Sequence, residues 1–206
     1  MNASSPIHLS VWRGGCPTLS EHSLPTGFAA LDDCLGGGWP LGALTEIQYR
    51  NEGIGELSLL LPGLAAMSRK DRWILWVAPP HLPYPPALAL ARLRMSRLLW
   101  IEEVRGNETL WVVEQSLQSP DCGAVLFWQG ARTAGQWRRL NRAAARGGGL
   151  AVWLHRTGVS EAFAPALRLG LERTCQELLM VSVLKRRGGW PQGPCVVKVG
   201  RDACIP

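Results

Sequence analysis

The stretch that decides the fold runs from residue 45 to residue 61 and reads Thr45-Glu46-Ile47-Gln48-Tyr49-Arg50-Asn51-Glu52-Gly53-Ile54-Gly55-Glu56-Leu57-Ser58-Leu59-Leu60-Leu61. Its first part predicts a buried strand that ends near Gln48, and its leucine-rich part predicts a helix that begins at Glu56. Two glycines lie between them, where a tight loop needs backbone freedom. A strand, a glycine-bearing loop and a helix in this order are the layout of a phosphate-binding loop.

The side chains of this loop do not suit a phosphate. A working loop follows the pattern G-x-x-x-x-G-K-[ST], in which the lysine neutralises phosphate charge and the hydroxyl residue binds Mg²⁺. Here Arg50 stands at the first glycine position, Glu56 at the lysine and Leu57 at the hydroxyl residue. A carboxylate about 4 Å from a phosphate charge costs roughly 4 kcal/mol at an effective dielectric near 20. The sequence therefore predicts a degenerate phosphate loop without a nucleotide cofactor, built from Arg50, Gly53, Gly55, Glu56 and Leu57. A plainer interpretation of Glu56 is a carboxylate that stabilises the positive end of the helix by about 0.3–1 kcal/mol.

Size and composition favour one globular domain. The chain has 206 residues, of which 47% are hydrophobic, and this is enough for one sizeable core. Its net charge of +6 is compatible with nucleic acid or an acidic protein as a partner. No apolar run approaches the roughly 20 residues that cross a bilayer, and residues 1–24 lack the pattern of a signal peptide. We therefore expect a cytoplasmic protein that does not act at a membrane.

The sequence predicts neither a metal site nor a catalytic site. Six cysteines and four histidines are scattered along the chain, whereas zinc sites use closely spaced ligand pairs. Reduced, mostly buried thiols are therefore expected. Glu102, Glu103 and Glu114 are candidates for a paired-carboxylate site, but no histidine or nucleophile accompanies them. The G-x-S-x-G motif of serine hydrolases is absent as well.

Short apolar runs alternate with helix-length segments after residue 42. The expected strands are Ala43–Gln48, Trp73–Ala78, Leu98–Ile101, Ala124–Trp128 and Leu150–Leu154, and the expected helices are Phe28–Leu35, Glu56–Ser68, Pro86–Arg94, Thr109–Gln118 and Gly135–Arg146. This alternation is typical of parallel strands joined by right-handed crossovers. Leu178–Lys185 and Pro194–Val199 read as two antiparallel strands added at the sheet edge. The predicted fold is α/β, a three-layer parallel-core sheet with a C-terminal antiparallel hairpin. Residues 1–23 are expected to form a flexible arm before a single domain over residues 24–206.

An ordered set of residues before the loop resembles the approach to the phosphate loop in RecA-type cores. The set is Thr26-Gly27, Leu31-Asp32, Leu35-Gly36-Gly37-Gly38, Pro40, Gly42 and Glu46-Ile47. Further stretches resemble the ImuA family, RecA-related accessory proteins of bacterial damage-induced mutagenesis. These stretches are Leu24-Pro25-Thr26-Gly27, Gly37-Gly38-Trp39-Pro40, Gly53-Ile54-Gly55-Glu56-Leu57, Val77-Ala78-Pro79-Pro80-His81-Leu82-Pro83-Tyr84 and Leu184-Lys185-Arg186-Arg187-Gly188-Gly189. Together they extend from about residue 24 to 190.

The resemblance implies a RecA-like domain that works without catalysis in the SOS response to DNA damage. ImuA proteins act with ImuB, an inactive Y-family polymerase relative, with RecA, and with an error-prone C-family DNA polymerase. The main expectation is therefore an accessory subunit of translesion DNA synthesis, with DNA as a further candidate partner. The cell-division inhibitor SulA is also similar to a degenerate RecA core, so the alternative is an inhibitor that binds a tubulin-like GTPase. A third alternative is an enzyme that hydrolyses nucleotide through unrecognised residues.

The resemblance also locates a second missing part of a nucleotide site. In RecA-type ATPases a later strand ends in an acidic residue that helps to hold the metal. The corresponding run, Cys122 to Gln129, ends without one. Asp121 precedes this strand, at the wrong end for ligands that gather at the carboxyl edge of an open sheet.

A proline-rich loop is the first candidate contact surface for a partner. It reads Pro79-Pro80-His81-Leu82-Pro83-Tyr84-Pro85-Pro86 and follows an expected strand. A stiff, extended and exposed segment suits protein recognition because it has little conformational entropy left to lose. We expect His81 and Tyr84 to be its contact residues. The plain alternative is a stiff crossover loop.

Two groups of cations are the other candidates. Arg138, Arg139, Arg142 and Arg146 share one face of an expected helix, which suits a phosphate backbone or an acidic protein segment. Lys185, Arg186 and Arg187 end an expected strand at a place that resembles the RecA element reaching a neighbouring subunit's nucleotide. The plain alternatives are a solvated outer helix and a charged edge that prevents sheet aggregation.

Nine of the ten tryptophans fall into two sets. Trp73, Trp76, Trp128 and Trp153 lie in strand-like runs, where buried aromatic rings supply core contacts. Trp12, Trp39, Trp100, Trp137 and Trp190 lie at element edges or in loops and are candidates for an interface.

Overall fold

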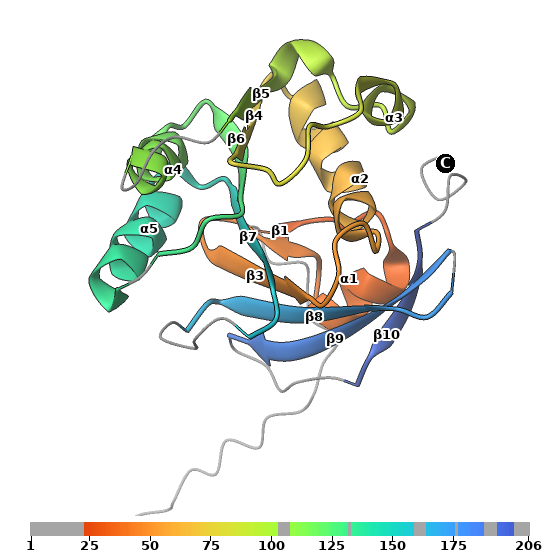
Figure 1. Ribbon diagram of the computed structural model, residues 1–206. Helices are drawn as coiled ribbons and strands as arrows, with labels where there is room; N and C mark the ends of the chain where they lie inside the picture. The colour runs from red at the N-terminus through yellow and green to blue at the C-terminus, as the bar shows by residue number, and fades with distance from the viewer. Residues whose placement is uncertain are drawn as a thin grey trace, which may run out of the picture.

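The computed structural model describes residues 23–102, 108–131, 133–158, 164–175, 177–187 and 193–199. Its centre is an eight-stranded sheet in the order β10-β9-β8-β3-β7-β6-β4-β5, with helices on both sides (Figure 1). These strands are β3 (Leu44–Tyr49), β4 (Trp73–Val77), β5 (Leu98–Ile101), β6 (Cys122–Phe127), β7 (Leu150–Arg156), β8 (Leu167–Arg173), β9 (Leu178–Arg186) and β10 (Cys195–Lys198). Two short strands, β1 (Ser23–Leu24) and β2 (Trp39–Pro40), pair separately.

The sheet is mixed and mostly parallel. The strands from β8 to β5 in the sheet order run parallel to one another, whereas β9 and β10 are antiparallel additions at one edge. The predicted α/β sheet with its C-terminal hairpin is therefore confirmed. The expectation of only two strands in the tail is wrong, because β8 lies between β3 and the hairpin. Its leucines at 167, 169 and 171 are buried and alternate with Arg168 and Gly170, the period of a strand.

The helices are α1 (Ala29–Leu35), α2 (Glu56–Arg69), α3 (Pro85–Leu90), α4 (Glu108–Gln118) and α5 (Ala134–Gly147), with a 3₁₀ turn at Met95–Arg97. Helix α1 ends where Gly36 adopts φ of 70°, a conformation that glycine adopts without strain. Helix α5 begins with a capping box in which Thr133 and Gln136 exchange side-chain and backbone hydrogen bonds. Within the described ranges, no helix combines the length and apolar character needed to cross a bilayer.

Helix α3 differs from the predicted Pro86–Arg94. It begins at Pro85 and ends at Leu90, and Arg92 turns the chain with φ of 59°. Two prolines start it because the first helical turn tolerates a residue without an N–H donor. Leu88, Ala91 and Leu93 are all buried. Their spacing resembles the hydrophobic pattern of a longer helix, which explains the wrong prediction. The last two prolines of the predicted extended loop are therefore helical.

Two hydrophobic cores lie on the two faces of the sheet. The larger core packs α1, α2 and α3 against one face, and the smaller packs α4 and α5 against the other. Trp76 and Trp153 are buried as predicted, whereas Trp73 and Trp128 are only half-buried. The interface expectation is wrong for Trp39 and Trp137, because both rings are buried. Trp12 and Trp190 lie outside the described residues.

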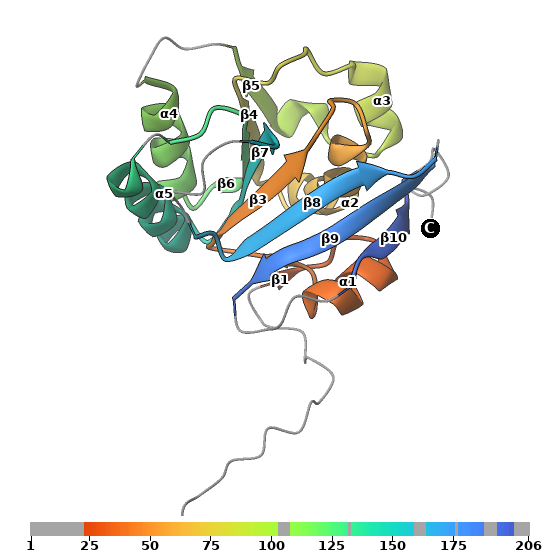
Figure 2. The same ribbon diagram turned by 60° about the horizontal axis from the view of Figure 1, so that its bottom comes forward.

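The part of the sheet that contains β8 and β9 has helices on one side only. Figure 2 shows these strands in front of α1 and α2, and no described helix lies on their near side. In the described residues, helices therefore cover one face of this half of the sheet, whereas they cover both faces of the half that contains β4 and β6.

A candidate partner-binding surface at the carboxyl edge of the sheet

The loop between β3 and α2 is closed by the side chain of Glu56. Gly53 and Gly55 adopt φ of 71° and 110°, a region that favours glycine. Their backbone N–H groups donate to the Glu56 carboxylate, with N···O distances of 3.2 Å from Gly53 and 3.1 Å from Gly55. The Glu56 side chain is buried. An external anion would have to displace this carboxylate before it could reach those donors.

Tyr49 lies beneath the same loop and remains a neutral phenol. Burial first, and then the negative charges of Glu56 and Glu52, raise the pKa of Tyr49 to about 12. Both effects disfavour a second negative charge at this place. The inner side of the loop is therefore a poor environment for a triphosphate.

Replacing Glu56 with alanine should destabilise the fold. The change leaves the N–H groups of Gly53 and Gly55 without their acceptor and removes a carboxylate from the first turn of α2. We expect the free energy of unfolding to fall by about 1–3 kcal/mol in urea titrations. Glu52→Ala is the control, because the contact between Glu52 and His81 is exposed, so this substitution should cost less than about 1 kcal/mol. Equal losses in the two variants would contradict the role given to Glu56.

The outer side of this loop is held by three neighbouring segments. Glu52 contacts Nε2 of His81 at 2.8 Å, which joins the loop to the proline-rich segment after β4. Arg173 at the end of β8 donates to the Gly53 carbonyl at 3.1 Å. Arg156 at the end of β7 donates to the Arg50 carbonyl at 3.3 Å. The carboxyl ends of four strands therefore meet around Arg50–Gly55, the edge where open α/β sheets bind their ligands.

An exposed apolar pair lies next to the contact between Glu52 and His81. Leu82 is 68% exposed and Tyr84 is 70% exposed, and Pro83 between them restricts the backbone. Aromatic side chains with little entropy left to lose are typical of protein interfaces. We call Glu52, His81, Leu82 and Tyr84 the edge surface. It can contact a macromolecule, but within the described residues no three His, Cys, Asp or Glu side chains gather to hold a metal.

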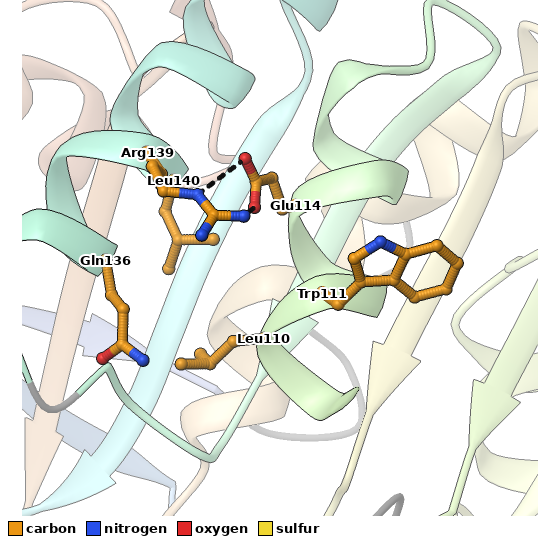
Figure 3. Close-up of a pocket in the computed structure, with 6 residues that line it drawn as sticks. All are labelled: Leu110, Trp111, Glu114, Gln136, Arg139 and Leu140. Carbon is orange, nitrogen blue, oxygen red and sulfur yellow. Dashed lines mark hydrogen bonds and ion pairs between the residues drawn. The ribbon is translucent and has the colours of Figure 1, made fainter. Parts of the chain in front are cut away.

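The arginines of α5 lie elsewhere, on the outer layer. Arg138, Arg142 and Arg146 are exposed. Arg139 is bound by Glu114 of α4 through two hydrogen bonds, the longer of which is 3.2 Å from Nε. Figure 3 shows this pair bridging the two helices, with Leu110 and Gln136 below it in the view. Arg139 therefore pairs with another residue of the same chain. The three other arginines remain candidates for contact with a partner.

The Lys185–Arg187 group is at a third location. Arg186 donates from its guanidinium to the Cys34 carbonyl of α1 at 3.3 Å, and its guanidinium packs against Gly36. Lys185 is paired in register with Arg168, and Arg187 is exposed. Because β9 runs antiparallel to β8, these residues lie at the opposite end of the sheet from Arg50–Gly55. The structure therefore joins the glycine loop to the proline loop but keeps both cation groups apart from them.

Sequence reasoning missed a buried polar cluster centred on Glu46 of β3. Its carboxylate contacts Nε2 of His155 at 2.9 Å and Nε of Arg168 at 2.8 Å. Gln48 also donates to it, at 2.8 Å. His155 in turn stacks on the Trp153 ring, with centroids 3.9 Å apart. The available signal was a charged residue in the middle of an apolar strand, because such a residue needs buried partners.

This cluster should make stability depend on pH. Burial alone would raise the pKa of Glu46, but hydrogen bonds from His155, Arg168 and Gln48 outweigh it and hold the pKa below its usual value of 4.5. A carboxyl whose pKa is lower in the folded state stabilises the fold above its unfolded pKa. The contribution should therefore be complete above about pH 4.5 and lost as the pH falls through the folded pKa. Urea titrations between pH 3 and 6, about the range that matters for a carboxyl, should show a steeper acid loss for the wild type than for Glu46→Gln. Equal slopes would contradict this assignment.

Comparison with known proteins identifies the family. A family model described as "Cell division inhibitor SulA" matches residues 42–151. The chain belongs to the SulA family. The match begins two residues before β3 and ends in β7, so it includes Glu56, the edge surface and α5. It ends before Lys185.

Individual relatives agree with the family match. The cell division inhibitor SulA of Edwardsiella piscicida is 34% identical over 92 residues, which are 44% of this chain and 55% of that relative. SulA of Serratia marcescens is 26% identical over 106 residues, or 52% of this chain and 63% of that relative. The chain thus spans between 55% and 63% of the length of these two SulA relatives. Protein RecA of Prochlorococcus marinus is 29% identical over 106 residues, 52% of this chain but 28% of RecA. These matches name SulA and RecA, so SulA membership replaces the ImuA resemblance as the established relationship.

Proposed function

We propose that this chain is a non-enzymatic cell-division inhibitor of the cytoplasm that acts by binding a tubulin-like GTPase. Membership of a family described as a cell division inhibitor supports the biological role. The observation that carries the absence of catalysis is the Glu56 carboxylate, which occupies the N–H donors of Gly53 and Gly55. Because a side chain of the protein occupies the N–H donors that would bind a phosphate, the loop is unsuited to nucleotide hydrolysis. Binding of a partner protein does not need those donors.

The proposal includes a RecA-like domain with a degenerate phosphate loop at Arg50–Leu57. The likeness to a RecA protein over 52% of the chain and the strand, loop and helix order of β3 and α2 support it. The helix N-terminus that would receive a phosphate instead receives the carboxylate of its own first residue. The layout of strand, loop and helix is retained, and the carboxyl edge of the sheet is available to bind a protein.

We assign partner contact to the edge surface. Leu82 and Tyr84 supply exposed apolar area, and the hydrogen-bonded side chains of Glu52 and His81 supply a polar rim. A buried aromatic anchor surrounded by polar groups is the usual arrangement of an energetically important interface. The His81–Glu52 contact also fixes the start of the proline segment, which lowers the entropy lost on binding.

Expression in dividing bacteria tests the proposed role. Cells that produce the wild type should grow into filaments, and the purified chain should co-sediment with a purified tubulin-like division GTPase and lower its GTP hydrolysis. Leu82→Asp with Tyr84→Ala should restore normal cell length at equal protein level. Leu184→Asp is the matched control, because Leu184 is 49% exposed on β9, away from this edge. Normal cell length with the wild type and no effect on the GTPase would reject the proposal.

A second function is an accessory role in translesion DNA synthesis within the SOS response. The likeness to RecA and the exposed arginines Arg138, Arg142 and Arg146 favour it. In that role the partners would be an ImuB-like inactive Y-family polymerase relative, RecA and the error-prone C-family polymerase, with DNA along α5. Co-purification with ImuB or RecA, without filamentation, would select this function. Binding to DNA would weaken steeply with salt, because each phosphate contact releases counterions.

A further inference from the structure

Two cysteine side chains face each other where helix α1 packs against strand β10 (Figure 2). Cys34 lies three residues after the buried Leu31 of α1, a spacing that places both side chains on one face of the helix. Cys34 is half-buried and packs against the larger core. Cys195, the first residue of β10, is buried within that same core. The two thiols therefore meet at the contact between the helix and the sheet.

This contact determines the chemical state of Cys195. Burial first, and then the hydrogen bond and the charge of the Cys34 side chain, raise the pKa of Cys195 to about 12. Cys195 therefore stays a protonated thiol at neutral pH, and a thiol is a much poorer nucleophile than a thiolate. Burial also shields it from molecules in solution. Oxidation of this pair from outside has to begin at Cys34, which is only half-buried.

Strand β9 holds both cysteines in position. The Cys34 carbonyl accepts a hydrogen bond from Nη1 of Arg186 in β9, at 3.3 Å. The Arg186 guanidinium also packs against Gly36, where α1 ends. Cys195 is paired in register with Val181 of the same strand. A disulfide requires two cysteines that the backbone already brings close together, and here the folded chain does so through β9.

We propose that Cys34 and Cys195 form a reversible intramolecular disulfide when the protein meets a peroxide. The Cys34 sulfur, as the thiolate, attacks one peroxide oxygen, the O–O bond breaks, and a sulfenic acid and one water result. The Cys195 sulfur then attacks the Cys34 sulfur, its proton passes to the departing hydroxyl group, and a second water leaves. The two thiols thus lose two hydrogens and two electrons, and the peroxide is reduced to water. This modification is independent of the function proposed above.

The disulfide would fasten one edge of the sheet. Among the described strands, β10 pairs with β9 alone, so its other backbone side has no strand to hold it. Val199, directly after β10, lies against Gly55 of the glycine loop. The bond would close a loop of about 160 residues, and a cross-link across a long loop restricts the unfolded chain most. Oxidation should therefore stabilise the fold and slow the opening of β10.

Peptide mapping of the peroxide-treated full chain tests the proposal. After a few equivalents of hydrogen peroxide and alkylation of the remaining thiols, mass spectrometry should find a linked pair of peptides that contain Cys34 and Cys195. Dithiothreitol should release them. Cys175→Ser is the matched control, because Cys175 is exposed and the linkage should form without it. Cys195→Ser should stop the reaction at the Cys34 sulfenic acid, which dimedone traps, and Cys34→Ser should leave Cys195 unoxidised.

Stability measurements test the consequence of the bond. The urea midpoint of the oxidised wild type should exceed that of the reduced wild type by about 1 M or more. Hydrogen exchange of the backbone N–H groups of β10 should slow by about tenfold or more, because local opening of an edge is restricted. Cys34→Ser, substituted at a half-buried position, should show neither change after the same treatment.

Three results would overturn the proposal. The first is the absence of the linkage at a peroxide concentration that oxidises Cys175. The second is a linkage of Cys34 or Cys195 to Cys16 or Cys204, which lie outside the described residues, or to another chain. The third is an equal urea midpoint for the oxidised and the reduced wild type. Cys34→Ser cannot form the linkage but keeps the edge surface, so this proposal and the proposed function fail separately.

Discussion

Tyr84→Ala is expected to weaken binding to the proposed partner, a tubulin-like GTPase, by about 30-fold or more. Aromatic anchors at interface centres contribute about 2 kcal/mol or more when truncated, and 2 kcal/mol corresponds to this factor in Kd. Tyr84 is 70% exposed in the free chain, so its removal takes nothing from the core. Calorimetric titration of the purified GTPase with the wild type and the variant measures the change.

Stability provides the control for this prediction. Tyr84→Ala should keep the urea midpoint of the wild type. Tyr84 is the N-cap residue of α3, but its exposed side chain makes no capping hydrogen bond, and such side chains change stability by about 0.5 kcal/mol at most. Leu184→Ala, another exposed apolar position, should leave the affinity unchanged. An affinity that is equal in all three proteins would remove Tyr84 from the interface. It would also leave the edge surface without its main apolar contact.

Arg168→Leu should lower the free energy of unfolding by about 3–5 kcal/mol. The variant removes the guanidinium that lies 2.8 Å from the Glu46 carboxylate and leaves that buried charge with only the hydrogen bonds from His155 and Gln48. Removing one partner of a buried ion pair is among the costliest single changes. Glu46 is only 3% exposed at its side chain and Arg168 is 12% exposed, so water does not replace the lost partner. Urea denaturation at neutral pH, followed by tryptophan fluorescence, measures the loss.

An exposed ion pair of the same sheet provides the matched control. Lys198 contacts Glu177 at 3.3 Å with both side chains more than half exposed, so Lys198→Ala should cost less than about 1 kcal/mol. Glu46→Leu combined with Arg168→Leu removes both charges and should recover part of the loss. A small loss for Arg168→Leu, similar to that for Lys198→Ala, would show that the cluster is not energetically important.

Most of the fold could be predicted from hydrophobic periodicity. The strand before the loop, the helix that begins at Glu56 and the C-terminal hairpin are all present. Buried strands and amphipathic helices each give a distinct hydrophobic periodicity in the sequence. The error at α3 has a local cause, since Leu88 and Leu93 are buried on opposite sides of a turn rather than along one helix. Strand β8 was missed although its leucines alternate, because Gly170 and the charged residues around it weaken a strand signal.

The site was only partly predictable. The carboxylate of Glu56 could be identified from one position in a motif, but its bonds to Gly53 and Gly55 depend on the loop conformation. The contact between Glu52 and His81 joins residues on different crossovers, and no local pattern reports such a pair. The Glu46 cluster brings together residues 122 positions apart in the chain. Long-range polar contacts of this kind follow from sheet order, which periodicity does not give.

Retention of Mg²⁺·ATP by the purified chain is the most direct test of the central claim. The account predicts no retention in equilibrium dialysis at millimolar nucleotide, because the Glu56 carboxylate already accepts the N–H groups of Gly53 and Gly55. It also predicts that the affinity for the protein partner is the same with and without Mg²⁺·ATP. Tight, magnesium-dependent binding of ATP by the wild type would contradict the account.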